Sequence, residues 1–148
     1  MLKKLLATGD ELAPLIARLT LAAVMFPHGA QKVLGWFGGY GFAGTYQAFT
    51  EQMHIPAPFA LLAIAAELLG PIGLALGLLG RVAALGIASV MAVAILMVHG
   101  QFGFFMNWFG GQKGEGFEYH ILALGLALIV MVRGSGALSV DRALAPRA

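Results

Sequence analysis

The sequence predicts an all-α protein whose helices form a four-helix bundle across a membrane. Of its 148 residues, 59% are hydrophobic and only 11% are charged, whereas soluble domains carry about 25% charged residues. Between Glu51 and Lys113 the only Asp, Glu, Lys or Arg residues are Glu67 and Arg81. This stretch leaves room for two membrane spans of about 20 residues each. We therefore expect a single integral membrane domain over residues 1–148.

Composition also excludes several classes of function. The net charge is +2 and the basic residues are scattered, so no nucleic-acid partner is expected. The chain has no Cys, which excludes thiol–disulfide chemistry, Cys-ligated metals and iron–sulfur clusters. It has no phosphate-binding loop, Ser–His–Asp set or nucleotide fingerprint. Redox chemistry would therefore need a bound cofactor or a diffusible carrier.

The first helix is expected over residues 12–34. Pro14 suits its first turn, where the missing N–H costs nothing. Pro27 lies inside the span and should kink it, which membrane helices tolerate when neighbours satisfy the freed carbonyl. A loop rich in Gly and aromatic residues follows over 35–58, with a short interfacial helix expected over 44–53.

The second and third helices are expected over 58–79 and 82–104, with a hinge at Gly80-Arg81 between them. Three glycines of the second helix have the spacing that lets membrane helices approach closely, namely Gly70, Gly73 and Gly77. A second outer loop precedes the fourth helix, which is expected over 117–133. The fourth helix has the shortest uncharged run of the four.

The distribution of Lys and Arg predicts the orientation in the membrane. One face of the predicted bundle holds most of the basic residues: Lys3, Lys4, Arg81, Arg133, Arg142 and Arg147. The opposite face holds only Lys32 and Lys113. Both termini are therefore expected to be cytoplasmic. An aromatic belt is then expected at the outer surface, formed by Trp36, Phe37, Trp108 and Phe109.

A short pattern occurs twice along the chain. His28-Gly29 and His99-Gly100 each end an apolar run, and a Trp-Phe-Gly-Gly sequence follows each of them, beginning at Trp36 and Trp108. This pattern favours two helical hairpins repeated in parallel, related by an axis along the membrane normal. Chance similarity among Gly and aromatic residues is the alternative.

Ionisable residues inside a membrane span are costly, so each is a functional hypothesis. The predicted spans and their ends hold Arg18, His28, Lys32, Glu67, His99, Glu118 and His120. At 1.5 Å per helical residue, His28 lies roughly 9 Å and Glu67 roughly 13 Å below the outer ends of their helices. All four helices thus bring an ionisable group into the outer half of the bundle. Arg18 lies nearer the inner face, where we expect it to snorkel to the headgroups or to set the topology.

Glu67 is too deep to snorkel easily, so it needs a partner or must be protonated. The first helix offers His28 and Lys32 on one stripe. We therefore predict that Glu67 faces the first helix and lies within hydrogen-bonding or one-water reach of His28, Lys32 or His99. A structural alternative stays open, in which such a contact only holds the helices together.

The candidate site combines these residues with nearby aromatic side chains. Candidates for catalysis are His28, Glu67 and His99, and candidates for ligand binding are His28, Lys32, Trp36, Glu67, His99, Trp108, Glu118 and His120. Glu118 and His120 lie near water, so a structural role is favoured for each. Arg18 and Arg81 are assigned to structure and topology.

A bound metal or haem is a further alternative. His and carboxylate side chains could ligate zinc, copper or non-haem iron, and His28 and His99 could be axial haem ligands. The chain has no His-x-x-x-His pair, and Glu118-Tyr119-His120 has the wrong spacing for one helix face. No residue is therefore assigned as a metal ligand.

Several of these positions, taken together and in order, resemble the DoxX family of small four-helix membrane proteins. They are Arg18, His28-Gly29-x-x-Lys32, Glu67 with Gly70, Gly77-x-x-x-Arg81, and the tail Gly134-x-Gly136-x-x-Ser139-x-Asp141. The resemblance implies a multi-pass protein of the bacterial inner membrane. The family name derives from a subunit of a thiosulfate:quinone oxidoreductase, and relatives are linked to quinone resistance and oxidative-stress complexes.

The resemblance and the intramembrane residues together favour a subunit that binds a quinone or quinol near the outer leaflet and supports an oxidoreductase. Its partners would be lipid, a soluble or membrane redox protein and further copies of itself. The rival class is a structural or assembly subunit without a ligand, and a His-ligated metal or haem protein is the second alternative. A transporter is not favoured, because four helices offer little room for a path unless the protein oligomerises.

Overall fold

The computed structural model describes residues 5–145, and every regular element within that range is helical. Four long helices carry the fold: α2 (Leu12–Leu34), α4 (Ala57–Leu76), α5 (Gly80–Ala94) and α6 (Glu118–Arg133). α2 runs unbroken through Pro27. The all-α prediction is therefore confirmed for the described part of the chain.

α5 continues past Ala94 as a π-helix, η3 (Ile95–His99), and a 3-10 turn, η4 (Gly100–Phe102). Among the described residues, three helical segments are long and apolar enough to cross a membrane: Leu12–Leu34, Ala57–Leu76 and Gly80–Phe102. α6 has 16 residues, which make a helix of about 24 Å. It is therefore shorter than a hydrocarbon core of about 30 Å.

The connection between α4 and α5 differs from the expected hinge at Gly80-Arg81. α4 ends at Gly77, whose φ of 65° lies in the left-handed region that favours glycine. Asp141 accepts hydrogen bonds from the backbone N–H groups of Leu79 (2.7 Å) and Gly80 (2.9 Å). α5 can therefore begin at Gly80, because a carboxylate satisfies the free donors at its N-terminus. The hinge lies before Gly80, and Arg81 is in the first turn of α5.

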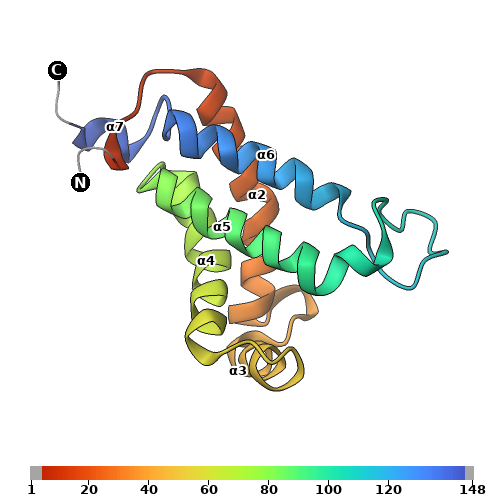
Figure 1. Cartoon of the computed structure of the whole chain (residues 1–148). Helices are drawn as coiled ribbons and strands as arrows, with labels where there is room; N and C mark the ends of the chain where they lie inside the picture. The colour runs from red at the N-terminus through yellow and green to blue at the C-terminus, as the bar shows by residue number, and fades with distance from the viewer. Residues whose placement is uncertain (1–4, 146–148) are drawn as a thin grey trace.

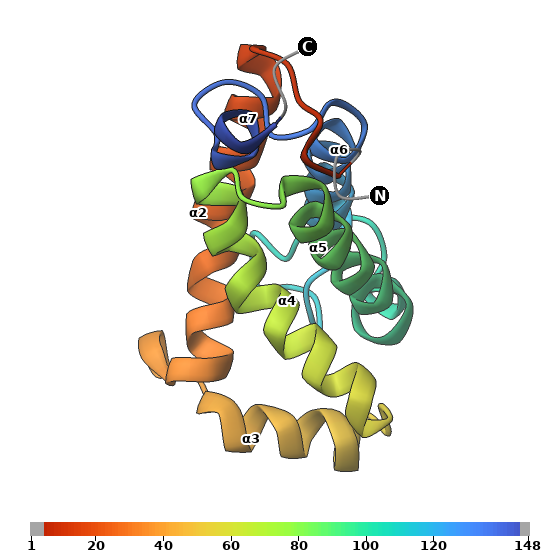
Figure 2. The ribbon, with the colours of Figure 1, turned by 90° about the vertical axis from the view of Figure 1, so that its left-hand side faces the viewer.

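The long helices form two hairpins, α2 with α4 and α5 with α6 (Figure 1). The hairpins meet beside the short helix α7 (Val140–Leu144), and α4 and α5 leave their connection in different directions. We call this meeting point the α7 end, and the end where α2 finishes and α4 begins the far end. α3 (Gly41–Gln47) and η2 (Ala48–Gln52) lie across α2 and α4 at the far end (Figure 2). They form the helix expected over 44–53.

The core lies where all four long helices meet. It is made of small and medium apolar side chains, which allow close helix packing. Its buried members are Ala17, Leu21, Ala22, Met25, Leu74, Ala84, Ile87, Met91, Ala123, Ala127 and Val130. Most of the large apolar side chains outside this core are exposed on the surface, as expected for helices that face lipid.

Arg18 holds the α7 end together and does not reach the surface, so the expectation that it snorkels is wrong. Its side chain is 1% exposed. The guanidinium donates to five backbone carbonyls: Leu74 (2.7 Å), Ala75 (2.7 Å), Ser135 (2.8 Å), Ala137 (3.2 Å) and Leu138 (2.7 Å). These carbonyls lie at the end of α4 and in the segment after α6. Arg18 thus ties α2 to both.

The segment after α6 is part of the packed structure. Asp141 is buried and accepts a third hydrogen bond, from Ser135 Oγ, at 2.6 Å. Arg81 donates to the last carbonyls of α6, Met131 and Val132 (the latter at 2.9 Å), and to the Ala7 carbonyl at 3.0 Å. Arg81 therefore caps α6, consistent with its assignment to structure.

Candidate functional site

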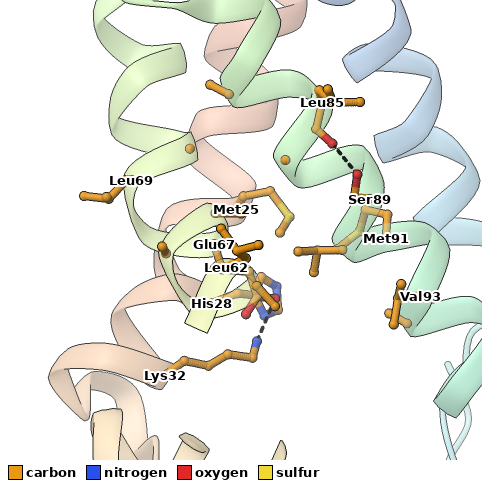
Figure 3. Close-up of a pocket in the computed structure, with 18 of the residues that line it drawn as sticks. Met25, His28, Lys32, Leu62, Glu67, Leu69, Leu85, Ser89, Met91 and Val93 are labelled. Carbon is orange, nitrogen blue, oxygen red and sulfur yellow. Dashed lines mark hydrogen bonds and ion pairs between the residues drawn. The ribbon is translucent and has the colours of Figure 1, made fainter. Parts of the chain in front are cut away.

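A cavity of about 1270 Å³ lies between α4 and α5, where the two hairpins diverge (Figure 3). Most of its wall is apolar. Its ionisable and hydroxyl side chains are His28, Lys32, Glu67, Ser89, His99, Glu115, Tyr119 and His120. Except for Ser89 on α5, these residues come from the last turns of α2, from Glu67 on α4, from the end of η3, and from the start of α6 and the loop before it. An apolar cavity with a few convergent polar groups is the usual form of a small-molecule site.

Glu67 contacts α2 as predicted. Its side chain is buried, with the residue 4% exposed. Lys32 Nζ donates to Glu67 Oε1 at 3.0 Å, and Figure 3 shows the lysine reaching the carboxylate across the gap between α2 and α4. The other oxygen, Oε2, has no hydrogen-bond partner among residues 5–145. One half of a buried carboxylate is thus available to a ligand or to water, because an unsatisfied buried acceptor is costly.

Gly29 explains why α2 comes so close to Glu67. A Cβ atom at position 29 would clash with the Glu67 carbonyl group and the Leu68 Cα atom on α4. The two helices therefore touch backbone to backbone at this level, which only glycine permits. This contact places Lys32, almost one turn further along α2, within reach of the Glu67 carboxylate.

α6 and η3 bring two histidines together on the other side of the cavity. The rings of His99 and His120 have their centroids 4.2 Å apart. His99 Nδ1 lies 2.8 Å from the Glu115 carbonyl oxygen, which can only accept, so Nδ1 carries the proton. His120 is 5% exposed and its Nδ1 has no partner in the described part of the chain. A second buried polar atom is therefore available at this site.

Tyr119 connects this pair with α2. Its hydroxyl donates to Met25 Sδ at 3.3 Å, and its ring lies 6.4 Å from that of His28 and 5.4 Å from that of His120. The four long helices, with η3 as the extension of α5, thus all contribute to one cluster. We name it the polar cluster; it comprises His28, Lys32, Glu67, His99, Tyr119 and His120.

Three predicted ligand-binding residues do not line the cavity. Trp36 is exposed and packs edge-on against Phe26 and Phe37. Trp108 is 77% exposed, and its Nε1 donates to Glu118 Oε1 at 3.1 Å. Glu118 also accepts from the Met106 N–H at 3.0 Å, so it holds the loop before α6. These three residues lie outside the cavity because Trp36 and Trp108 are in the segments beyond the helix ends and the Glu118 carboxylate binds the loop before α6.

The structure also shows residues that sequence reasoning missed or placed differently. Tyr119 and Met25 line the cavity. Neither is charged near neutral pH, so a search for ionisable residues within the predicted spans did not select them. His120 was expected near water, but α6 turns it inward. The two His-Gly copies differ as well: Gly29 packs against α4, whereas a Cβ at Gly100 would approach only the Ile95 carbonyl of its own segment.

Within residues 5–145, no group of three or more His, Asp or Glu side chains is placed to hold a metal ion. His99 and His120 form a pair, and the other members of the polar cluster do not complete a set of metal ligands. The described residues therefore offer no set of ligands that supports the metal alternative.

A comparison with known protein families covers part of the residues that form the site. A sequence model of the DoxX family matches residues 13–100, from the start of α2 to the beginning of η4. The chain therefore belongs to the DoxX family, and it is a membrane protein. The matched part holds Arg18, His28, Lys32, Glu67 and His99, whereas α6 with Tyr119 and His120 lies outside it. No curated protein and no solved structure matches the chain.

Proposed function

We propose that the protein binds a quinone or quinol in the cavity between α4 and α5 and serves an oxidoreductase as a membrane subunit. The observation that carries the proposal is the pair of unsatisfied buried atoms, Glu67 Oε2 and His120 Nδ1, on residues that line a mostly apolar cavity. A quinone ring has an oxygen at each of two opposite edges. In the quinol form these oxygens are hydroxyls, which can donate to the Glu67 carboxylate and to an unprotonated nitrogen of His120, whereas a quinone oxygen only accepts and needs a protonated Glu67 or an N–H of His120.

The charges at the site support binding of a neutral ring. Lys32 offsets the charge of Glu67, and Glu67 Oε2 can accept a proton from a quinol hydroxyl. His120 can accept or donate at its free nitrogen, according to its protonation state. Oxidation of a quinol to a quinone releases two electrons and two protons. Glu67 and His120 would take the protons, and a redox partner protein would take the electrons, since the chain has no Cys.

The same proposal includes the placement in the membrane. α6 forms the fourth span of a bacterial inner-membrane protein, and both termini are cytoplasmic, so the polar cluster lies in the outer half of the bilayer. The excess of Lys and Arg at the α7 end supports this orientation. The shortness of α6 is accommodated by local thinning of the bilayer. A reporter fused to the C-terminus should be active in the cytoplasm; activity only in the periplasm would overturn the topology.

The binding test uses the purified protein and menadione, a quinone ring without a tail. Menadione reacts with thiols, and the absence of Cys means that a shift reports non-covalent binding. At about a hundred times its Kd, a ligand stabilises the folded state by about 2.7 kcal/mol, a rise in Tm of roughly 5 °C or more. With menadiol, the quinol form whose hydroxyls can donate to both groups, Glu67→Gln and His120→Phe should each reduce the rise.

Glu51→Gln is the matched control, because Glu51 bonds only to Gln47 on an exposed face of η2. It should leave the menadione-induced rise in Tm unchanged. If menadione changes neither the Tm nor the absorption spectrum of the unaltered protein, the proposal fails.

A structural subunit without a ligand is the second candidate, and the Lys32–Glu67 ion pair favours it, because the pair joins α2 to α4. The two candidates predict different results for Glu67→Gln and His28→Gln. Under the structural role both variants lose Tm in the absence of any quinone, and menadione has no effect on either. Under the binding role the loss appears mainly in the response to menadione.

A further inference from the structure

The cavity extends well beyond the polar cluster, toward the α7 end. Leu76 lies nine positions after Glu67, which corresponds to about 14 Å along α4. The walls of this part are apolar on both helices: Leu69, Ile72 and Leu76 from α4, and Val82, Leu85 and Val90 from α5. Ser89 is the one hydroxyl there among the lining residues, and it donates to the Leu85 carbonyl at 2.8 Å. We call this part the apolar groove.

Small residues form the floor of the apolar groove. A Cβ at Gly86 would lie 3.1 Å from that of Ala66, and a Cβ at Gly73 would lie 3.4 Å from that of Ala83. α4 and α5 are therefore in close contact along the floor. Larger side chains rise on either side of it, and Figure 3 shows Leu69 and Leu85 on opposite sides of the space. The result is a channel with a narrow floor and apolar walls, open toward the lipid.

The two parts of the cavity differ in what they can bind. At one end, Glu67 is 4% exposed and has one oxygen without a partner among the described residues. Along the rest, the groove offers neither a charge nor a free hydrogen-bonding side chain. A polar end that continues into a long apolar channel matches an amphiphile with a small polar head and a chain-like tail. A wholly polar solute would leave the groove empty, and a plain hydrocarbon would leave the Glu67 oxygen unsatisfied.

We infer that the ligand is a prenylated quinone whose ring lies at Glu67 and His120 and whose tail lies in the apolar groove, directed toward the α7 end. This inference rests on the proposed function and adds the tail and its path. The ring enters from the lipid between α4 and α5, because the groove is open on that side. The tail supplies affinity by burial of its CH₂ groups against the apolar walls.

The test compares two quinones with one ring. Menadione and phylloquinone share the methylnaphthoquinone ring, and only phylloquinone carries a long prenyl-type tail. Ser89→Phe fills the groove from an exposed position on α5 without touching the polar cluster. Thr20→Phe is the matched control, because Thr20 is an exposed hydroxyl residue on α2 that does not line the cavity. Affinities are measured in the same micelles at a fixed detergent concentration, so that partitioning of the quinones into detergent is the same for every variant.

The unaltered protein and Thr20→Phe should bind phylloquinone at least about tenfold more tightly than menadione. Ser89→Phe should lose this preference and keep the affinity for menadione, which also shows that the variant is folded. Val82→Phe provides the same obstruction nearer the α7 end if Ser89→Phe does not fold.

Three outcomes overturn the inference. If Ser89→Phe and Val82→Phe keep the preference for phylloquinone, the tail lies elsewhere, and the proposed function stands. If they leave quinone binding unchanged but lose co-purified phospholipid or a dimer, the groove is a lipid or self-association surface. If neither quinone binds to the unaltered protein, the proposed function itself fails.

Discussion

Lys32 Nζ donates to Glu67 Oε1 at 3.0 Å, whereas Glu67 Oε2 is buried without a hydrogen-bond partner in the described structure. The lysine therefore fixes the position of the carboxylate and leaves half of it free. The two oxygens of this side chain can therefore have different roles: Oε1 joins α4 to α2 through Lys32, and Oε2 is available for binding. Substitutions at position 67 should reveal both roles.

Glu67→Leu is expected to weaken quinone binding more than Glu67→Gln. Gln keeps an oxygen that can accept from Lys32 and an amide that can meet a ligand, whereas Leu keeps neither. We expect the affinity for menadiol, the quinol form whose hydroxyl can donate to Glu67 Oε2, to fall about tenfold for Gln and to be lost for Leu, since one hydrogen bond to a charged group contributes about 1.5–3 kcal/mol. Equilibrium titration of the two variants measures this order. Equal affinities for Gln and Leu would contradict the role of Glu67.

Gly29→Ala is expected to destabilise the protein. The added methyl group would press on the α4 backbone at Glu67 and Leu68, and overpacking of this kind costs about 1–3 kcal/mol. The matched control is Gly125→Ala on α6, where a Cβ atom meets nothing within 4 Å. There the exchange should be neutral or stabilising by up to about 1 kcal/mol, because Ala is the better helix former. Thermal unfolding in detergent distinguishes the two, and equal effects would refute the backbone contact.

Arg18→Lys should be almost as damaging as Arg18→Met. The planar guanidinium reaches five carbonyls in two segments, whereas an ammonium has three donors at one point. Loss of at least two charge-assisted hydrogen bonds should cost about 3 kcal/mol or more. Arg142→Gln is the control, because Arg142 makes an exposed ion pair with Asp10 at 2.5 Å. The readout is the yield of folded protein and its Tm; full stability of Arg18→Lys would be inconsistent with this arrangement.

Acid should weaken the junction between the start of α2 and the end of α6. Hydrogen bonds from Arg133 hold the pKa of the exposed Glu11 carboxyl below its usual value of 4.5. Because the folded-state pKa is lowered, this contribution is fully present above pH 4.5 and is lost as the pH falls through the folded-state value. Glu11→Gln should therefore lower the Tm slightly near pH 7, where the ion pair is lost, and leave it unchanged in acid, so that the fall of Tm in this range becomes flatter. If the Tm of Glu11→Gln falls with decreasing pH as steeply as that of the unaltered protein, other groups cause the fall.

The arrangement of the helices along the chain could be predicted from the sequence, because length and hydropathy are local properties. The apolar runs predicted α2, α4 and α5, and the cost of a charge in lipid singled out Glu67. The same reasoning predicted its contact with α2, since Lys32 and His28 lie on one stripe at a suitable depth. The residues within α2 were thus enough to identify a partner for Glu67.

Other features were decided only by the tertiary structure. Arg18 binds carbonyl groups 56–120 positions away in the chain, and every residue carries a carbonyl, so no side-chain pattern marks its partners. His120 is buried and Trp108 is exposed because of the direction in which α6 and its preceding loop leave the bundle. The cavity itself exists because α4 and α5 touch along their small residues and then diverge, and that angle depends on packing between segments far apart in the sequence.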